Sequence, residues 1–204
     1  MTPSGDSEAS AGRPRQVTDK QIFQALAEAI TEVGPTNWTL DDVGARLRIT
    51  GPALGYRFGN KRGLLVAFAA HQPGATADRF DEAAASKAPL DAMYDALTGT
   101  LEHMDTRAKV ANNVAMLSID LADDELAAYA KAQARVIKEQ ICHLLVAAGV
   151  ASAEHAPDLA HRIYIVWSGA VLAWAIDGRG PLDTWVRGHI ADLIDEPSEP
   201  QSRS

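Results

Sequence analysis

Helix-start signals recur along the first third of this chain, so closely spaced that helices are predicted over most of it. Thr18, Thr39, Thr50 and Asn60 each precede a segment whose apolar residues recur at helical spacing. A short polar residue in this position caps a helix, because its side chain accepts a hydrogen bond from a backbone N–H of the first turn. No run of alternating apolar and polar residues is long enough to predict a strand. The sequence therefore predicts an all-α fold.

The first predicted helix carries signals at both of its ends. Thr18 and Gln21 have the three-residue spacing of a capping box. Gly34 followed by Pro35 ends the helix, because Gly readily takes the left-handed conformation there and Pro cannot continue the helix. Three helices and the start of a fourth within residues 18–71 predict a compact helical module.

The second and third predicted helices, at 39–47 and 50–58, are separated only by Arg48 and Ile49. Two short helices joined by a minimal turn form a helix-turn-helix, whose second helix lies in the major groove of DNA. Residues 43–77 contain no Asp or Glu, although the formal net charge of the whole chain is −8. The basic residues in this window are Arg46, Arg48, Arg57, Lys61 and Arg62. The pattern predicts that this segment binds double-stranded DNA.

The charge is distributed unequally along the chain. Residues 13–71 hold eight Lys or Arg against five acidic residues, which gives +3, whereas residues 72–204 hold eleven against twenty, which gives −9. Such an asymmetry indicates that the basic segment faces an anionic partner. Two alternatives stay open: the basic residues form an ordinary solvated helical face, or they form a docking surface for an acidic protein.

The second helix of the motif supplies most of the predicted DNA contacts. Thr50 offers a hydroxyl and adjacent amides to a phosphate, while Arg57 suits a base edge or a phosphate and Lys61 a second phosphate. Exposure is expected at Gly51, Pro52, Tyr56 and Arg57, and inward packing at Ala53, Leu54 and Phe58. Arg13 and Arg15 are expected to enter the minor groove as a flexible arm. The complete predicted contact set is Thr39, Arg48, Thr50, Gly51, Pro52, Tyr56, Arg57 and Lys61.

Changes in composition divide the chain into four parts. Residues 1–12 form a disordered tail, 13–71 a DNA-binding domain with the helix-turn-helix at 39–58, 72–194 a helical ligand-binding and dimerisation domain, and 195–204 a second disordered tail. The sequence Gln72-Pro73-Gly74 is expected to break the helix that starts at Lys61. Further helices are predicted over 76–85, 90–104, 107–120, 123–148, 156–177 and 182–194.

The C-terminal part mixes sulfur, aromatic and polar groups in a way that suits a binding cavity for a small molecule. Plain core packing is an equally good interpretation for any one of these residues. Because the surroundings are acidic, a neutral or cationic ligand is expected in preference to an anion. The predicted ligand contacts are Met93, Tyr94, Leu97, His103, Asn112, Asn113, Met116 and Trp167.

Two of the predicted helices, near 123–148 and 156–177, are expected to form a four-helix bundle with a second copy of the chain, with a single-chain core as the alternative. The longest apolar stretch, at 163–176, is shorter than the roughly 20 residues that a bilayer requires. We therefore expect it to be a buried helix of a soluble protein, with no membrane as a partner.

Residues 13–71 also resemble the DNA-binding domain of the tetracycline-repressor (TetR) type of bacterial regulator. The resemblance implies a homodimer, a palindromic operator, a C-terminal ligand domain, and phosphate contacts at Thr50, Tyr56 and Lys61. Three positions depart from the usual pattern: Gly44, Arg48 and Gly55. The matching residues are Gly12-Arg13-Pro14-Arg15, the amphipathic first helix, Trp38-Thr39-Leu40-Asp41-Asp42-Val43, Ile49-Thr50-Gly51-Pro52-Ala53-Leu54, Tyr56-Arg57-Phe58, and Lys61 with Leu64-Leu65.

The sequence shows no nucleophile elbow, phosphate loop, dinucleotide fingerprint or Cys-rich metal pattern, so no catalytic residue, cofactor or metal ion is expected. Cys142 is the single cysteine, and the polar start does not resemble a signal peptide, which together favour the cytoplasm. The resemblance implies that this is a bacterial cytoplasm. The first hypothesis is a repressor that a small ligand releases from DNA. The alternative is a small helical carrier or enzyme in which the basic module is structural.

Overall fold

The computed structural model describes residues 17–195 and is entirely helical within that range, apart from the connecting turns and loops. The predicted all-α fold is therefore confirmed. Both predicted tails and the proposed arm at Arg13 and Arg15 lie outside the described residues, except for Asp195, which ends the last helix. The elements are α1 (Asp19–Val33), α2 (Leu40–Leu47), α3 (Gly51–Phe58), α4 (Lys61–Ala84), α5 (Pro89–Thr98), the 3-10 helix η1 (Gly99–Leu101), α6 (Arg107–Ala122), α7 (Asp124–Ala147), α8 (Ala156–Asp177) and α9 (Leu182–Asp195).

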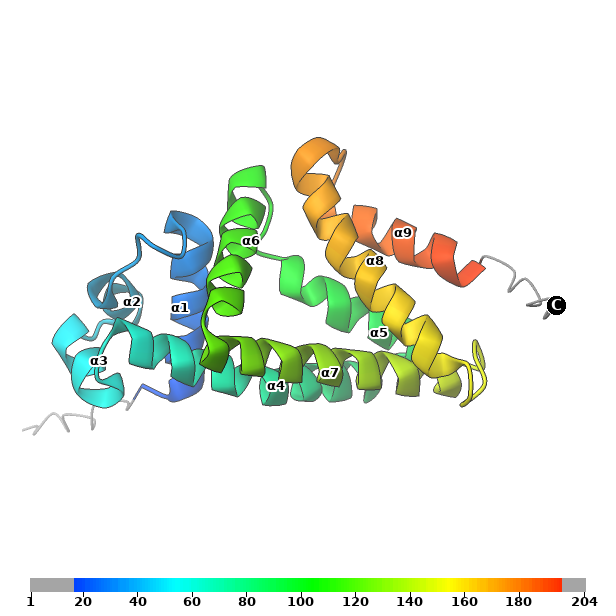
Figure 1. Cartoon of the computed structure of the whole chain (residues 1–204), viewed down its shortest axis with the longest axis horizontal. Helices are drawn as coiled ribbons and strands as arrows, with labels where there is room; N and C mark the ends of the chain where they lie inside the picture. The colour runs from blue at the N-terminus through cyan, green and yellow to red at the C-terminus, as the bar shows by residue number, and fades with distance from the viewer. Residues whose placement is uncertain (1–16, 196–204) are drawn as a thin grey trace, which may run out of the picture.

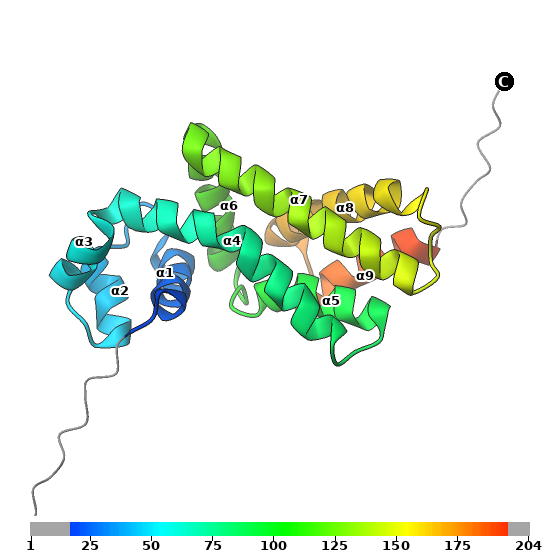
Figure 2. The ribbon, with the colours of Figure 1, turned by 90° about the horizontal axis from the view of Figure 1, so that it is seen from below.

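The helices form an elongated molecule with a small three-helix unit at one end (Figure 1). We call α1, α2 and α3 the head. From the head, α4 runs the length of the molecule beside α7 and in the same direction, while α5, α8 and α9 pack at the far end (Figures 1 and 2). Helix α6 packs against α1 on one side and against α7 and α8 on the other. The head is thus connected to the rest of the chain through α4 and α6.

The predicted caps are confirmed where the sequence placed them. The side chain of Thr18 accepts a hydrogen bond from the N–H of Gln21, whose own side chain binds the N–H of Thr18. Gly34 ends α1 with a φ of 90°, and Asn60 caps α4 through the N–H of Gly63. These ends were predictable because a cap involves residues only two or three positions apart.

The expected break at Gln72-Pro73-Gly74 is wrong. Helix α4 continues through Pro73, so the predicted helices at 61–71 and 76–85 are one helix. An interior Pro costs about 3 kcal/mol, which tertiary packing on both sides of it outweighs: Leu64 is buried against the head, and Phe80 is buried against α5 and α7. The other predicted helices agree with the structure within a few residues, and the span 156–177 coincides with α8.

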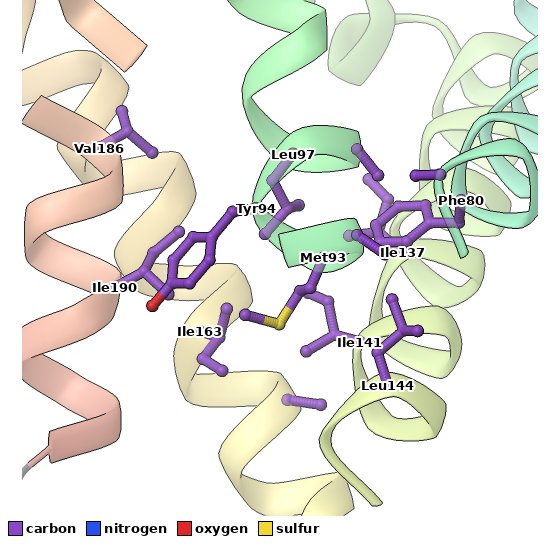
Figure 3. Close-up of a cluster of buried hydrophobic side chains, with 14 of the residues drawn as sticks. Phe80, Met93, Tyr94, Leu97, Ile137, Ile141, Leu144, Ile163, Val186 and Ile190 are labelled. Carbon is purple, nitrogen blue, oxygen red and sulfur yellow. The ribbon is translucent and has the colours of Figure 1, made fainter. Parts of the chain in front are cut away.

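Two clusters of buried side chains hold the molecule together. The smaller one fills the head and includes residues of α4 together with Met116 of α6. The larger one contains side chains from α4 through α9. Figure 3 shows part of it, where Met93 and Leu97 of α5 lie among side chains of α4, α7 and α8. Because Met116 packs into the smaller cluster, the head and the larger helical unit share a boundary instead of a flexible linker.

Helix α8 is not buried on all sides, contrary to the expectation for the apolar stretch 163–176. Ile165, Leu172 and Ile176 are 54%, 47% and 69% exposed. Among the described helices, α8 alone has the length and the apolar composition that a membrane-spanning helix needs. Only 22% of its most apolar 18-residue segment is buried. The sequence pattern shows that a helix has apolar faces. It does not show whether those faces pack against the same chain or against another molecule.

Candidate nucleic-acid interface

The helix-turn-helix is built from two capped helices in the head. Thr39 and Asp42 form a capping box at the start of α2, with Thr39 N–H donating to Asp42 Oδ2 at 2.8 Å. These hydrogen bonds from Thr39 hold the pKa of Asp42 below its ordinary value. Thr50 caps α3 by accepting a hydrogen bond from the N–H of Ala53 at 3.3 Å, and Pro52 stands in the first turn, where its missing N–H is harmless.

The turn between α2 and α3 brings the two backbones very close. Ile49 N–H donates to Gly44 O at 3.0 Å, and a Cβ on Gly44 would lie 2.5 Å from Ile49 O. Gly44 is therefore required by the crossing of the chain. The departure from the TetR pattern at this position is a structural necessity in this protein, and its cost in helix propensity is offset by the close approach that it permits.

The start of α3 is tied to α2 by a carboxylate for which the sequence predicted no role. Asp41 Oδ1 accepts a hydrogen bond from the N–H of Gly51 at 3.0 Å, and a Cβ on Gly51 would lie 2.2 Å from that oxygen. Gly51 is buried, so the expectation that it would be exposed toward DNA is wrong. An Asp in the first turn of α2 followed ten residues later by a Gly that opens α3 is the pattern that signals this contact.

The outer face of α3 is open to solvent. Tyr56 is 96% exposed, Pro52 and Arg57 are exposed, and Leu54 is buried in the head, as predicted. Ala53 is exposed instead of packing inward, because it shares the outer face with Tyr56 three residues later. The surface that α3 presents therefore consists of small or flat groups around one prominent tyrosine.

Arg48 occupies the turn itself. It is the one non-glycine residue in 17–195 with a positive φ, 57°, and this strain costs about 1 kcal/mol. Its side chain is exposed and forms no ion pair with any described residue. Arg48 is therefore a cation that stands beside α3 with its charge unpaired by the rest of residues 17–195.

Most of the other basic side chains of the window are bound within the molecule. Arg46 pairs with Glu28 and Glu32 of α1. Arg57 donates to Val17 O at 2.8 Å and to Asp19 Oδ1 at 2.9 Å. Arg46 and Arg57 thus meet acids from outside the acid-free window. Residues 19–58, which span the head, hold four Lys or Arg against five acidic residues, so the head has no net positive charge.

Lys61 is fastened to the loop between α1 and α2. Its Nζ donates to Trp38 O at 2.6 Å and to Thr36 O at 2.9 Å, and lies 4.5 Å from the centre of the Trp38 ring system. Burial lowers the pKa of Lys61, an effect that the charge of Asp42 partly offsets. Two of its three N–H donors are occupied, so Lys61 braces the head and keeps one donor for a phosphate.

Two polar contacts lie at the boundary of the head, one between the start of α4 and the start of α7 and one between α1 and α6. Arg62 donates from Nε and Nη2 to Asp123 Oδ2 at 3.2 and 2.9 Å, and from Nη2 to Glu125 at 3.0 Å. On the other side of the head, Asn112 and Asn113 of α6 donate to the backbone oxygen and the hydroxyl of Thr31 at 2.9 and 3.3 Å. We call these two contacts the Arg62 latch and the Thr31 latch.

The residues predicted to contact a ligand do not converge on one place. Met93, Tyr94 and Leu97 lie in the large core (Figure 3), whereas His103 is exposed after η1. Burial raises the pKa of the Tyr94 phenol, and the Arg187 guanidinium stacks 4.4 Å from the centre of its ring.

The remaining predicted ligand contacts have structural partners. Asn112 and Asn113 make the Thr31 latch, and Met116 fills the core of the head. Trp167 donates from Nε1 to Leu97 O at 3.2 Å. Helical periodicity placed these residues on the inner faces of helices but did not show which neighbouring helix each face meets.

Comparisons with known proteins identify the architecture. No protein-family model and no curated protein sequence matches the chain. Among solved structures, a TetR transcriptional regulator from Legionella pneumophila is similar, with 18% identity and a TM-score of 0.65 over 89% of this chain and 97% of that one. A TetR transcription regulator from Haloarcula marismortui shares 15% identity with a TM-score of 0.68 over 87% and 96% of the two chains. This chain has the TetR-type fold.

A third similar structure, of a transcriptional regulator, contains a ligand. FadR from Bacillus subtilis, in complex with stearoyl-CoA, shares 13% identity with a TM-score of 0.54 over 87% of this chain and 98% of that one. The resemblance drawn from residues 13–71 is thus confirmed for the fold, and the likeness extends over both the head and the larger helical unit. At these identities it shows the fold alone.

A half-buried carboxylate, that of Asp120, lies near the junction between α6 and α7. Its Oδ1 is buried without a hydrogen-bond partner in the described chain. Burial, together with the nearby charge of Asp123, raises the pKa of Asp120 to about 6. Because the ordinary value is 3.8, the ionised form of Asp120 destabilises the folded state at neutral pH.

Asp120→Asn is expected to stabilise the protein at pH 7.5 and to stabilise it less at pH 5, which lies between the ordinary and the raised pKa of Asp120. The folded-state pKa is raised, so the stability that protonated Asp120 contributes is present at low pH and is lost as the pH rises through about 6. Urea unfolding at both pH values measures the difference from the wild type. Asp81→Asn, an exposed change on α4, controls for the loss of one negative charge. A gain that is equal at the two pH values would contradict the assignment.

Gly44→Ala and Gly55→Ala are expected to have opposite effects although both replace an interior helical glycine. The Cβ at Gly44 meets backbone at 2.5 Å, and overpacking of this kind costs about 1–3 kcal/mol. The Cβ at Gly55 meets only a side-chain carbon of Leu40 at 3.8 Å, so the gain in helix propensity, up to about 1 kcal/mol, should be realised. Urea midpoints measure both changes, and stabilisation by Gly44→Ala would refute the close approach.

Proposed function

We propose that the protein is a DNA-binding transcriptional regulator that acts as a homodimer on a palindromic operator, and that it is a repressor released by a small ligand. The observation that carries this proposal is the exposed outer face of α3, held by two close backbone contacts at one end of a TetR-type fold. A fold so arranged presents a rigid helix to the major groove.

The head offers three kinds of contact to a duplex. Tyr56 projects from the middle of α3 and suits a phosphate or the edge of a base. Thr50 and the positive end of the helix suit a phosphate at the start of α3. Arg48 adds an unpaired cation at the turn. These contacts come from one continuous stretch of chain and address one side of the head.

Arg57 joins the interface by exchanging partners. Its pair with Asp19 is substantially exposed, and exposed ion pairs contribute at most about 1 kcal/mol. A DNA phosphate is therefore able to replace the carboxylate at little cost. Thr39 is engaged in the capping box, which makes it a positioning residue for α2. The contact set proposed for DNA is accordingly Arg48, Thr50, Pro52, Tyr56 and Arg57, with the third donor of Lys61.

A second copy of the chain is proposed to cover the outer face of α8. Ile165, Leu172 and Ile176 expose an apolar face that a soluble protein rarely leaves open. Two copies joined through α7 and α8 would form a four-helix bundle and carry two heads, one for each half of a palindrome. This arrangement would account for the apolar character of α8 without a membrane, and we propose a cytoplasmic protein on that basis.

Release by a ligand requires that the ligand bind the DNA-free shape more tightly than the DNA-bound shape. The Arg62 latch and the Thr31 latch provide the mechanical connection. Displacement of α6 moves a contact of α1 directly, and displacement of α7 moves the start of α4, whose Leu64 packs in the core of the head. The stearoyl-CoA complex of the structurally similar FadR supports a small organic molecule as the effector.

Gel-shift titration with the DNA that flanks the protein's own gene tests the function. The wild type should bind, and Tyr56→Ala and Arg48→Asn should each weaken binding. Asn tolerates the left-handed turn, so Arg48→Asn removes charge without adding strain and should lower the dependence of log affinity on log salt by about one unit. Arg135→Gln, an exposed Arg on α7, is the matched control. The absence of any shift at low salt by intact protein would refute the proposal.

Leu172→Glu is expected to convert the dimer into a monomer, because it places a charge in the centre of the proposed α8 contact. Light scattering after size-exclusion chromatography gives the mass directly. Val33→Glu, at the end of α1, is the control, since Val33 is 44% exposed and Leu172 is 47% exposed. A wild type that is already monomeric at micromolar concentration, or a variant that stays dimeric, would exclude α8 as the interface.

A further inference from the structure

Arg79 lies on α4 in a position that is unusual for a cation. Its Nε is buried and has no hydrogen-bond partner among the described residues. The guanidinium donates from Nη2 to Thr76 Oγ1, at a long 3.4 Å. Burial lowers the pKa of Arg79, and no neighbouring carboxylate opposes this effect within residues 17–195. Arg79 as a whole is half-buried, and a partly buried positive charge that no acid compensates is costly and is seldom kept without a function.

Arg62, on the same helix, shows what the edge of a guanidinium formed by Nε and Nη2 can bind. Its Nε and Nη2 together grip the carboxylate of Asp123 at 3.2 and 2.9 Å. In Arg79, Nη2 makes a long hydrogen bond to a hydroxyl and Nε has no partner, and neither meets an anion within the described chain. The fork formed by Nε and Nη2 has the spacing of two oxygens of a carboxylate or a phosphate. Arg79 is therefore equipped for an oxyanion that residues 17–195 do not supply.

The neighbours of Arg79 are also donors. Thr76 is fully buried, and its Oγ1 accepts from Gln133 Nε2 of α7 at 3.2 Å as well as from Arg79. A hydroxyl that accepts twice keeps its own proton to donate. The seam between α4 and α7 thus combines a guanidinium, a hydroxyl and an amide. Phe80 and Ile137, each close in sequence to one of these residues, belong to the apolar core beside it (Figure 3).

We propose that Arg79, Thr76 and Gln133 form a binding site for an organic anion, with a carboxylate or phosphate group held by the Nε–Nη2 edge of Arg79. The adjacent apolar core suits a hydrocarbon portion on the same ligand. This assignment reverses the expectation of a neutral or cationic ligand, because that expectation used the summed charge of the C-terminal part, whereas recognition depends on the groups within hydrogen-bonding distance.

The proposed site also offers a route by which a bound ligand could alter the position of the head. Both helices of the seam carry the Arg62 latch at their N-terminal ends, with Arg62 on α4 and Asp123 at the cap of α7. An anion that draws Arg79 and Gln133 together changes the spacing of α4 and α7, and the latch transmits that change. This regulatory consequence depends on the proposed function, whereas anion binding itself does not.

Thermal unfolding and calorimetric titration of the purified protein without DNA test the site. The probes are octanoate and inorganic phosphate at matched ionic strength, with octanamide as the neutral control. The melting temperature of the wild type should rise saturably with one anion and not with octanamide, and the responding anion identifies the source of the oxyanion. Arg79→Met should weaken binding roughly tenfold or more, and Arg135→Gln should leave it unchanged.

Two further readouts keep the test decisive. Without anion, Arg79→Met should be at least as stable as the wild type, because it removes an uncompensated buried charge. Arg79→Lys keeps the charge but loses the fork, so its affinity should lie between those of the wild type and Arg79→Met. Binding of neither anion by the wild type, or equal binding by Arg79→Met, would overturn the site. Gel shifts of the same preparations separate that failure from a failure to bind DNA.

Discussion

The close approach of α2 and α3 is the constraint on which the rest of the molecule depends. Gly44 and Gly51 have no space for a side chain, and the carboxylate of Asp41 binds the first amide of α3. These contacts fix the angle between the two helices before any partner binds. If α3 binds DNA as we propose, a helix held in this way would lose little conformational entropy on binding. The exposed face around Tyr56 would then need only a small contact area.

Electrostatics inside the protein differs from the pattern of charges along its sequence. Arg46, Arg57 and Arg62 each meet a carboxylate that lies far away in the chain. The pairs fasten α2, α3 and α4 to their neighbours, so these three cations serve the fold, and of the three only Arg57 belongs to the proposed DNA contacts. In the same way, Arg79 stands out only after folding, when its neighbours prove to be donors. Counting charged residues along a segment identifies a candidate interface. The ion pairs formed in the folded protein decide which of those charges remain free to bind a partner.

The local part of this structure was predictable, and the long-range part was not. The capping residues Thr18, Thr39, Thr50 and Asn60 act on amides two or three positions away, so the sequence showed where helices start. The predicted break at Pro73 was wrong because packing against other helices, which the local sequence does not show, keeps α4 continuous there. The exposed position of Tyr56 followed from helical periodicity, whereas the predicted ligand contacts scattered because periodicity cannot pair one helix face with another.

The central claim is that two copies of the head, joined through α8, read one palindrome. Selection of duplexes by the wild-type protein from a random-sequence pool tests this claim directly, since the pool contains every candidate operator. We predict enrichment of a palindromic motif whose half-site centres lie one helical turn, about 34–36 Å, or a multiple of it apart. Recovery of no common motif, or of a single half-site without symmetry, would contradict the claim.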